Sequence, residues 1–104
     1  MNDKELLELA AKASGYDIDI DHAGLFHIHE GTGQQSWSTW NPLTDDGDAL
    51  RLAVKLSLSI WRYDTLSTSK PNFTDWQCDE RGDDPYAATR RAIVRAAAEI
   101  GRHR

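Results

Sequence analysis

Residues 83–101 read DDPYAATRRAIVRAAAEIG, and this stretch carries both a start signal and a stop signal for one helix. Asp84 can accept a backbone N–H bond as the N-cap, and Pro85 suits the first helical position, where no donor is needed. Gly101 suits the left-handed residue that commonly follows a helix. The stretch therefore predicts a helix that ends at Ile100. Its expected apolar side contains Tyr86, Ile93, Ala97 and Ile100.

The length and composition of the chain are those of a small globular protein. Its 104 residues are 39% hydrophobic and 28% charged, so we expect one domain over residues 1–104. No run approaches the roughly 18 apolar residues of a membrane helix, and the acidic N-terminus lacks the layout of a signal peptide. The single Cys78 fits a reducing cytosol and, in a strand, is more often a small core residue than a catalytic thiol. We therefore expect a cytoplasmic protein without a membrane partner.

Charge is distributed unevenly along the chain. The net charge is −5, yet residues 85–104 hold five arginines and only one glutamate. Most of the surface should repel a phosphate backbone, so we do not expect nucleic acid as a partner. The arginines of the last helix complement its macrodipole, or they offer a local phosphate-binding stripe at Arg90 and Arg91.

The N-terminal part predicts a helix followed by a β-hairpin. The helix should run from Asn2 or Asp3 to Ala13 and end at Gly15. Residues 16–21 alternate apolar and acidic side chains, and residues 25–30 form the returning strand.

The turn of this hairpin sets its register. If residues 22–24 form a three-residue loop, Gly24 takes the left-handed position, which places Ile20 opposite Phe26 and Ile18 opposite Ile28. One face is then apolar, and a slip by one residue would mix apolar with polar side chains.

The other face of the hairpin pairs Asp19 with His27 and Asp17 with His29. Carboxylates opposite histidines are favourable cross-strand partners. Two histidines on one strand face with two facing carboxylates are also weak candidate metal ligands. Because zinc usually takes four well-placed ligands and the chain offers no further clear pair, we expect no metal and no cofactor.

The middle of the chain predicts a short strand and a second helix. The strand covers residues 36–40 and is broken by Asn41-Pro42. Thr44 or Asp45 should cap a helix that runs to Leu56. The side chains expected to be buried in it are Leu50, Ala53 and either Val54 or Leu56.

The remaining segments complete the expected fold. Residues 58–63 alternate as a strand, residues 65–72 read as a polar loop, and residues 73–78 read as a further strand. The order of elements is α-β-β-β-α-β-β-α. We expect an α+β domain with one mostly antiparallel sheet of four to five strands, covered by three helices in a layered α/β/α sandwich.

Two segments with turn and capping signals, WNPLTDDGDALRLAV at residues 40–54 and DDPYAATRRAIV at residues 83–94, carry a resemblance to a known family. Their layout resembles small phage and prophage proteins of the phage ABA-sandwich type, whose function is unassigned. In that family an Asn-Pro turn leads into a helix, and a second helix that begins at a proline closes the chain. The matching segments cover about a third of this chain. The resemblance implies a phage or prophage origin and a bacterial host, and it transfers no catalytic residue.

Aromatic residues supply the candidate binding surface. Four tryptophans are many for a small domain: Trp37, Trp40, Trp61 and Trp76. Trp37 and Trp40 lie on opposite faces of their strand, so both are core residues only if both faces are covered. Otherwise one of them marks a surface together with Tyr63, since aromatic residues concentrate at interface centres. The candidate binding residues are Trp37, Trp40, Trp61, Tyr63, Arg90 and Arg91.

The sequence contains no Ser-His-Asp order, glycine-rich phosphate loop or Cys-His dyad that would indicate an enzyme. We therefore expect a non-enzymatic phage accessory protein that binds a host protein and modulates a defence or regulatory system. One alternative is a small-molecule binding module that sequesters a nucleotide signal with an aromatic ring and the Arg90/Arg91 stripe. Homodimerisation is a further alternative, because a sheet of this size leaves an edge strand exposed.

Overall fold

The computed structural model describes residues 2–29, 37–71 and 77–104, in which nine elements follow one another. They are α1 (Asp3–Ser14), β1 (Asp17–Ile20), β2 (Phe26–His29), β3 (Trp37–Thr39), α2 (Asp46–Lys55), β4 (Leu58–Tyr63), β5 (Leu66–Pro71), β6 (Cys78–Arg81) and α3 (Pro85–Arg102).

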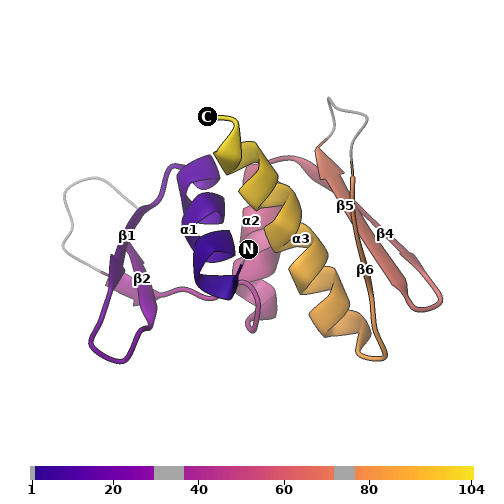
Figure 1. Cartoon of the computed structure of the whole chain (residues 1–104), viewed down its shortest axis with the longest axis horizontal. Coiled ribbons are helices and arrows are strands. Elements are labelled where there is room, and N and C mark those ends of the chain that lie inside the picture. The colour runs from indigo at the N-terminus through magenta and orange to yellow at the C-terminus, as the bar shows by residue number, and fades with distance from the viewer. Residues whose placement is uncertain (1, 30–36, 72–76) are drawn as a thin grey trace.

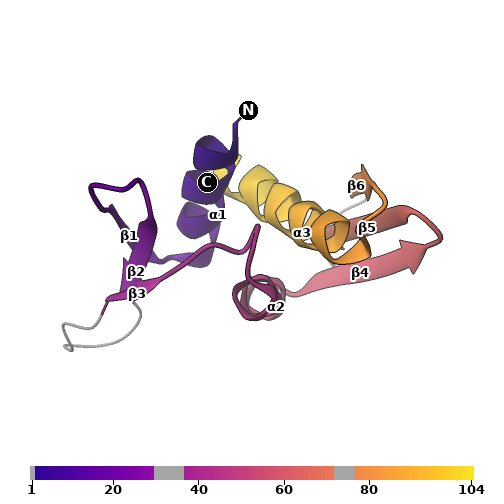
Figure 2. The same cartoon turned by 90° about the horizontal axis from the view of Figure 1, so that it is seen from below.

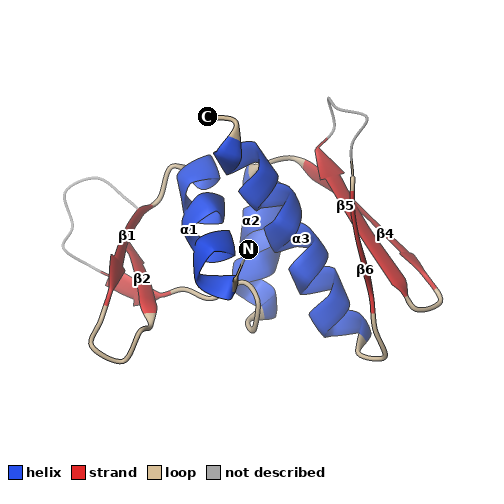
Figure 3. Ribbon diagram, viewed as in Figure 1, coloured by secondary structure: helices blue, strands red, loops and turns tan. Residues whose placement is uncertain are grey.

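The strands form two antiparallel sheets of three strands each, in the orders β1-β2-β3 and β4-β5-β6. The three helices lie between the sheets, with β1–β3 on one side and β4–β6 on the other (Figures 1 and 3). The α+β class and the three helices were predicted correctly. The expected single sheet of four to five strands, covered by helices on both faces, was wrong.

Small side chains explain why the helices form the central layer. α1 packs directly against α3, and α3 also contacts α2 and all three strands of the second sheet. Ala10 and Ala11 of α1 and Ala97 and Ala98 of α3 are fully or almost fully buried. Because these side chains are short, the backbones of α1 and α3 approach closely. The alanine faces of the two helices are therefore buried against each other and not against a sheet. Each sheet then covers one flank of the helical layer.

Gly101 has a different role from the predicted helix stop. α3 continues through Gly101 to Arg102, and its C-cap is His103. A Cβ atom at Gly101 would lie 2.9 Å from the carbonyl carbon of Leu9 and closer still to its oxygen. Glycine is therefore required here by the close crossing of α1 and α3, and not by a left-handed backbone.

The predicted N-caps are confirmed at all three helices. Asn2 accepts a hydrogen bond from the N–H of Glu5, Asp45 from that of Asp48, and Asp84 from those of Tyr86 and Ala87. The predicted end of α1 is also confirmed, because Gly15 has a φ of 77°. These local signals place both ends of α1 and the beginnings of α2 and α3.

The buried face of α2 agrees with the prediction at Ala53 and at Leu56, which is partly buried against the core, and differs at Leu50. Ala49, Leu52 and Ala53 are buried, whereas Leu50 and Val54 are exposed. Both sets have helical spacing, and the side of α2 that packs on α3 carries Ala49, Leu52 and Ala53. The structure therefore leaves the second apolar stripe of α2 at the surface. Tyr86, expected on the apolar side of α3, is exposed in the same way.

The first hairpin has the predicted register, with Ile20 opposite Phe26 and Ile18 opposite Ile28. Phe26 and Ile28 are buried in the core, while Ile20 at the end of its strand is partly exposed. β3 adds to β2, and the chain then turns inward at Trp40. The expected strand at residues 36–40 is therefore observed as Trp37–Thr39, and Ser36 lies outside the described residues.

β5 is a strand where a polar loop was expected over residues 65–72. Ser67, Thr68 and Ser69 are buried although they are polar. Two of their hydroxyls are hydrogen-bonded, because Ser67 contacts Arg62 and Thr89, and Thr68 donates to Asp79. Side-chain hydrogen bonds thus stabilise a central strand that has no hydrophobic alternation.

The last predicted strand, at residues 73–78, falls mostly outside the described residues. Within them, β6 begins at Cys78 and continues to Arg81, three residues beyond the predicted end. β6 pairs with β5, which makes β5 the central strand of its sheet and β4 one of its edges.

Candidate functional site

A groove of about 520 Å³ lies between α2, β4 and the first turns of α3. Its exposed apolar side chains are Leu50 of α2, Ile60 of β4 and Tyr86 of α3, which are 61%, 38% and 68% exposed. Buried Ala49 and Ile93 complete the apolar wall. Three large apolar side chains from three different elements therefore converge on one open hollow.

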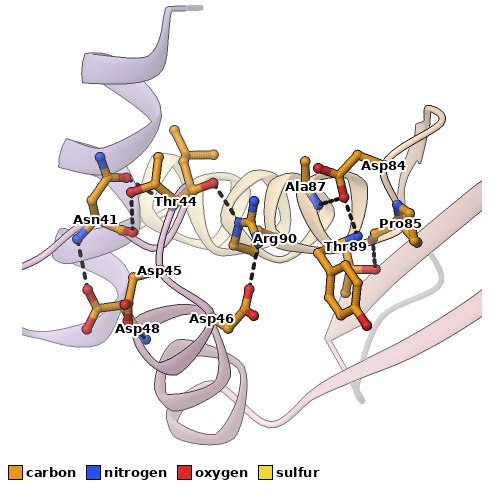
Figure 4. A network of polar contacts seen from close by, with 12 residues as sticks. Asn41, Thr44, Asp45, Asp46, Asp48, Asp84, Pro85, Ala87, Thr89 and Arg90 are labelled. Atoms are coloured by element: carbon orange, nitrogen blue, oxygen red, sulfur yellow. Dashed lines mark hydrogen bonds and ion pairs between the residues drawn. The ribbon is translucent and has the colours of Figure 1, made fainter.

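Capping residues fix the α3 side of the groove (Figure 4). The Asp84 Oδ1 accepts hydrogen bonds from the N–H groups of Tyr86, at 3.0 Å, and Ala87, at 3.2 Å. Thr89 donates its hydroxyl hydrogen to the carbonyl of Pro85, at 2.7 Å. These bonds order the first turn of α3, which carries Tyr86, one of the residues that line the groove.

The α2 side is fixed by the turn that precedes this helix. The Asn41 N–H donates to Asp48 Oδ2 at 3.0 Å, and the Asn41 Oδ1 accepts from the N–H of Leu43 at 3.0 Å. Asp45 caps α2. The turn therefore sets where α2 begins and which of its side chains face α3.

Arg90 connects the two sides. Its guanidinium donates to the carbonyl of Leu43 at 2.8 Å and to Asp46 Oδ1 at 2.6 Å, and its side chain is 17% exposed. Figure 4 shows Arg90 between α3 and the start of α2. The residue predicted to bind phosphate is thus engaged in holding α2 and α3 together.

A second set of hydrogen bonds connects the groove to the sheet. Arg62 donates to the Ser67 hydroxyl at 2.7 Å, and the Ser67 and Thr89 hydroxyls are 2.9 Å apart. This chain of contacts runs from β4 through β5 to α3. It holds β4 at a fixed position relative to the helices, so the groove is largely pre-formed.

The opposite face of β4 carries two of the predicted binding residues. Trp61 and Tyr63 line a hollow of about 280 Å³ on the other side of the sheet, together with Lys70 of β5. The Lys70 Nζ lies 5.9 Å from the centroid of the Trp61 ring. Both aromatic side chains are exposed. β4 therefore presents Ile60 and Arg62 to the groove and an aromatic pair to the other face.

The remaining predicted binding residues do not join this surface. Trp40 is 2% exposed and packs edge-on against Tyr16, with 5.7 Å between the ring centroids, so it is a core residue. Arg91 pairs with Asp3 at 2.8 Å and with Glu80 at 3.6 Å, away from the groove that Arg90 lines. The predicted Arg90/Arg91 stripe is therefore divided between two sites. The side chains of Trp37 and Trp76 lie outside what the structure describes.

The acidic and histidine face of the first hairpin has the predicted backbone pairing, with Asp17 opposite His29 and Asp19 opposite His27. The His27 imidazole, however, contacts Asp21 Oδ2 in the turn, with Nε2 at 2.8 Å. Among the described residues no three His, Cys, Asp or Glu side chains are placed to hold a metal ion. The side chain of His29 is outside them.

Asp21 is the titratable group of this hairpin whose environment is clearly perturbed. The hydrogen bond with His27, and next the bond from the N–H of Leu25, lower the pKa of Asp21. Its Oδ1 also accepts from the N–H of Ala23 at 2.9 Å. Asp21 therefore stabilises the turn as a carboxylate.

Cys78 is buried at the start of β6, and burial raises the pKa of its thiol. A buried thiol with a raised pKa is a poor nucleophile. The expectation that Cys78 is a core residue is confirmed by its burial.

Leu50, Ile60, Arg62 and Tyr86 were missed as site residues. Leu50 and Tyr86 were assigned to buried helix faces, because apolar residues at helical spacing usually face a core. The signal that could have found Leu50 is the presence of two apolar stripes on α2, of which only one can pack on α3.

No family model, curated protein or solved structure matches this chain. Of the helices in the described part of the chain, none combines the length and hydropathy that a membrane span needs.

Proposed function

We propose that this chain is a non-enzymatic binding protein whose groove between α2, β4 and α3 receives part of a partner protein. The observation that carries the proposal is the convergence of exposed Leu50, Ile60 and Tyr86 on one hollow. Contiguous exposed apolar side chains with a polar rim are typical of protein interaction sites. Here the polar lining residues are Asp46, Arg62, Thr89 and Arg90.

The polar groups of the groove support binding over catalysis. Asp46 pairs with Arg90, and the Thr89 hydroxyl donates to a backbone carbonyl. Arg62 donates to the Ser67 hydroxyl and to the carbonyl of Asp64. These contacts engage the groups in structural roles, and none of them is a nucleophile poised beside a base.

We further propose that the protein is encoded by a phage or prophage and acts on a host protein in the bacterial cytoplasm, as a modulator of a defence or regulatory system. The support is the resemblance of residues 40–54 and 83–94 to small phage proteins. Both segments contribute to the groove, through Leu50 of α2 and Tyr86 of α3. The parts of the chain that carry the resemblance therefore meet at the proposed binding site.

A pair of matched variants tests this function. Leu50→Glu places a charge in the groove, whereas Val54→Glu places the same charge one turn further along α2, at a residue that is 70% exposed and does not line the groove. Both positions are at the surface, so we expect both variants to fold. The tagged chain is used to capture proteins from host lysate, followed by mass spectrometry. We expect a host protein that wild type and Val54→Glu retain and Leu50→Glu loses; equal retention by both variants would contradict the proposed site.

A nucleotide ligand is the second candidate function, because the groove volume lies within the range of small-molecule sites and the Tyr86 ring borders it together with Arg62. A thermal-shift panel of mono-, di- and cyclic nucleotides tests it. A true ligand at a hundredfold excess over its Kd should raise the free energy of unfolding by about 2.7 kcal/mol. The increase should disappear in Leu50→Glu and remain in Val54→Glu. An unchanged melting temperature across the panel would reject this candidate.

A further inference from the structure

β4 is an edge strand of six residues. Its side chains line the groove on one face and the Trp61/Tyr63 hollow on the other. In the described part of the chain it pairs only with β5, and it forms the lower margin of its sheet in Figure 2. Natural proteins commonly shield such an edge with proline, an inward-pointing charge or a covering element. β4 contains no proline and carries one charged residue, Arg62, on its groove face, and its residues from Ile60 to Tyr63 are exposed.

The hairpin register shows which backbone groups face the open edge. Tyr63 lies opposite Leu66 across the loop of Asp64 and Thr65, and residues that flank a two-residue loop form a hydrogen-bonded pair. Pairs alternate along an antiparallel ladder, so Trp61 also bonds to β5. The N–H and C=O groups of Ile60 and Arg62 then point away from β5. They are available at the same residues whose side chains line the groove.

Two cations beside this edge, Arg62 and Lys70, lack acidic partners among the described residues, whereas Asp46, the carboxylate that lines the groove, is paired with Arg90. Arg62 donates to the Ser67 hydroxyl and to the Asp64 carbonyl, each at 2.7 Å, and the Lys70 ammonium lies over the Trp61 ring. Neither cation forms an ion pair with a described carboxylate, whereas Arg90, Arg91 and Arg95 of α3 all do. Arg62 of β4 lies on the groove face of the sheet, and Lys70 of the neighbouring strand β5 lies on the other face, in a chain of net charge −5.

We infer that the partner binds by adding an extended, acidic segment as a fourth strand beside β4. This inference rests on the proposed function and names the partner's chemistry. Side chains on the groove face of the segment are apolar against Leu50, Ile60 and Tyr86, except for one carboxylate that faces Arg62. A carboxylate on its other face lies toward Lys70, and its backbone bonds to Ile60 and Arg62. A second copy of this chain fits less well, because pairing through β4 would bring the same two cations of both copies together.

A peptide selection tests the inference while the partner itself is still unidentified. A library of random peptides slightly longer than the six residues of β4 is selected on the full chain. Amide hydrogen exchange is then measured by NMR with and without a selected peptide. We expect enriched peptides with apolar residues and one acidic residue on one strand face and an acidic residue on the other face, together with slower exchange at Ile60 and Arg62. Removing the charges with Arg62→Gln and Lys70→Gln should weaken binding by about 1.4- to 5-fold each, as expected of exposed ion pairs. Lys12→Gln, an exposed lysine of α1, is the control and should leave binding unchanged.

Three results would overturn the inference: no enrichment, enriched peptides without acidic residues, or binding that leaves the exchange of Ile60 and Arg62 unchanged. The exchange of these amides is also measured without peptide at increasing protein concentration. If their protection increases with concentration, a second copy of the chain occupies the edge, and the inference is overturned. If Leu50→Glu abolishes capture of a host protein while that protein leaves both amides unprotected, the proposed function stands and strand addition fails. If selected acidic peptides protect both amides but no host protein is captured, strand addition stands and the host function fails.

Discussion

The crossing of α1 and α3 makes a quantitative prediction for Gly101→Ala. An alanine Cβ would lie 2.9 Å from the carbonyl carbon of Leu9 and closer to its oxygen. Both atoms belong to the backbone, so no side chain can rotate away and one helix must shift. Overpacking of this kind costs about 1–3 kcal/mol. The better helix propensity of alanine offsets up to about 1 kcal/mol of that cost. We expect a net loss of about 1–2 kcal/mol.

For a domain of this size, a loss of about 1 kcal/mol lowers Tm by roughly 4–8 °C, so Gly101→Ala should lower Tm by about 5–15 °C. Circular dichroism during thermal and urea unfolding measures the change. Gly47→Ala is the matched control, because its Cβ would lie 3.3 Å from the terminal nitrogens of Arg51, an exposed side chain that can move, and 3.3 Å from Oδ2 of the α2 cap Asp45, with no backbone atom that close. We expect its Tm to change much less than that of Gly101→Ala. A Gly101→Ala protein as stable as wild type would refute the close helix crossing.

Three further predictions concern single residues. Asp21→Asn should lower Tm at neutral pH, because the lowered pKa of Asp21, caused first by its bond with His27, means that its carboxylate form stabilises the fold. This difference should be present above the ordinary aspartate pKa of about 3.9 and vanish as pH falls through the lowered value. Cys78 should react with a thiol reagent only upon unfolding, because it is buried and its pKa is raised. Asp84→Ala should cost about 1 kcal/mol through loss of the α3 cap, measured by urea unfolding.

Each of these predictions has a control and a contradicting result. Asp19→Asn removes a neighbouring exposed carboxylate, and a Tm loss as large as that of Asp21→Asn would show a general charge effect. Rapid labelling of Cys78 in the native protein would show that β6 opens readily. Asp83→Ala, adjacent to the cap, should be nearly neutral. An equal loss for Asp83→Ala and Asp84→Ala would remove the capping explanation.

Features that depend on neighbouring residues were predicted well from the sequence. The caps Asn2, Asp45 and Asp84 each need only a side-chain oxygen and the next turn of backbone. The register of the first hairpin followed from one loop and one apolar face, which any slip would expose. In both cases the deciding interactions lie within a few residues along the chain.

Features that depend on distant contacts were predicted poorly. Gly101 looked like a helix stop, and its actual reason is Leu9 at the other end of the chain. β5 looked like a loop, because Ser67 and Thr68 are polar and their partners lie on other elements. The division into two sheets has the same cause, since it depends on how closely α1 and α3 pack.

The candidate site was predicted in part. Trp61 and Tyr63 were singled out and are exposed on β4, whereas Trp40 proved to be a core residue. Leu50 and Tyr86 were assigned to the core, because an apolar residue on an amphipathic helix has the same pattern whether it faces a core or a binding groove. Only the packing of α2 on α3 separates the two cases.

Photo-crosslinking from the groove tests most directly whether this surface binds a partner. A photoreactive benzoyl-phenylalanine replaces Tyr86, and in a control chain it replaces Asp17, an exposed residue of the other sheet. After irradiation in host lysate, we predict one abundant crosslinked host protein from position 86 and none from position 17. A partner that crosslinks only from position 17, or equally from both, would contradict the assignment of binding to the groove and its edge strand.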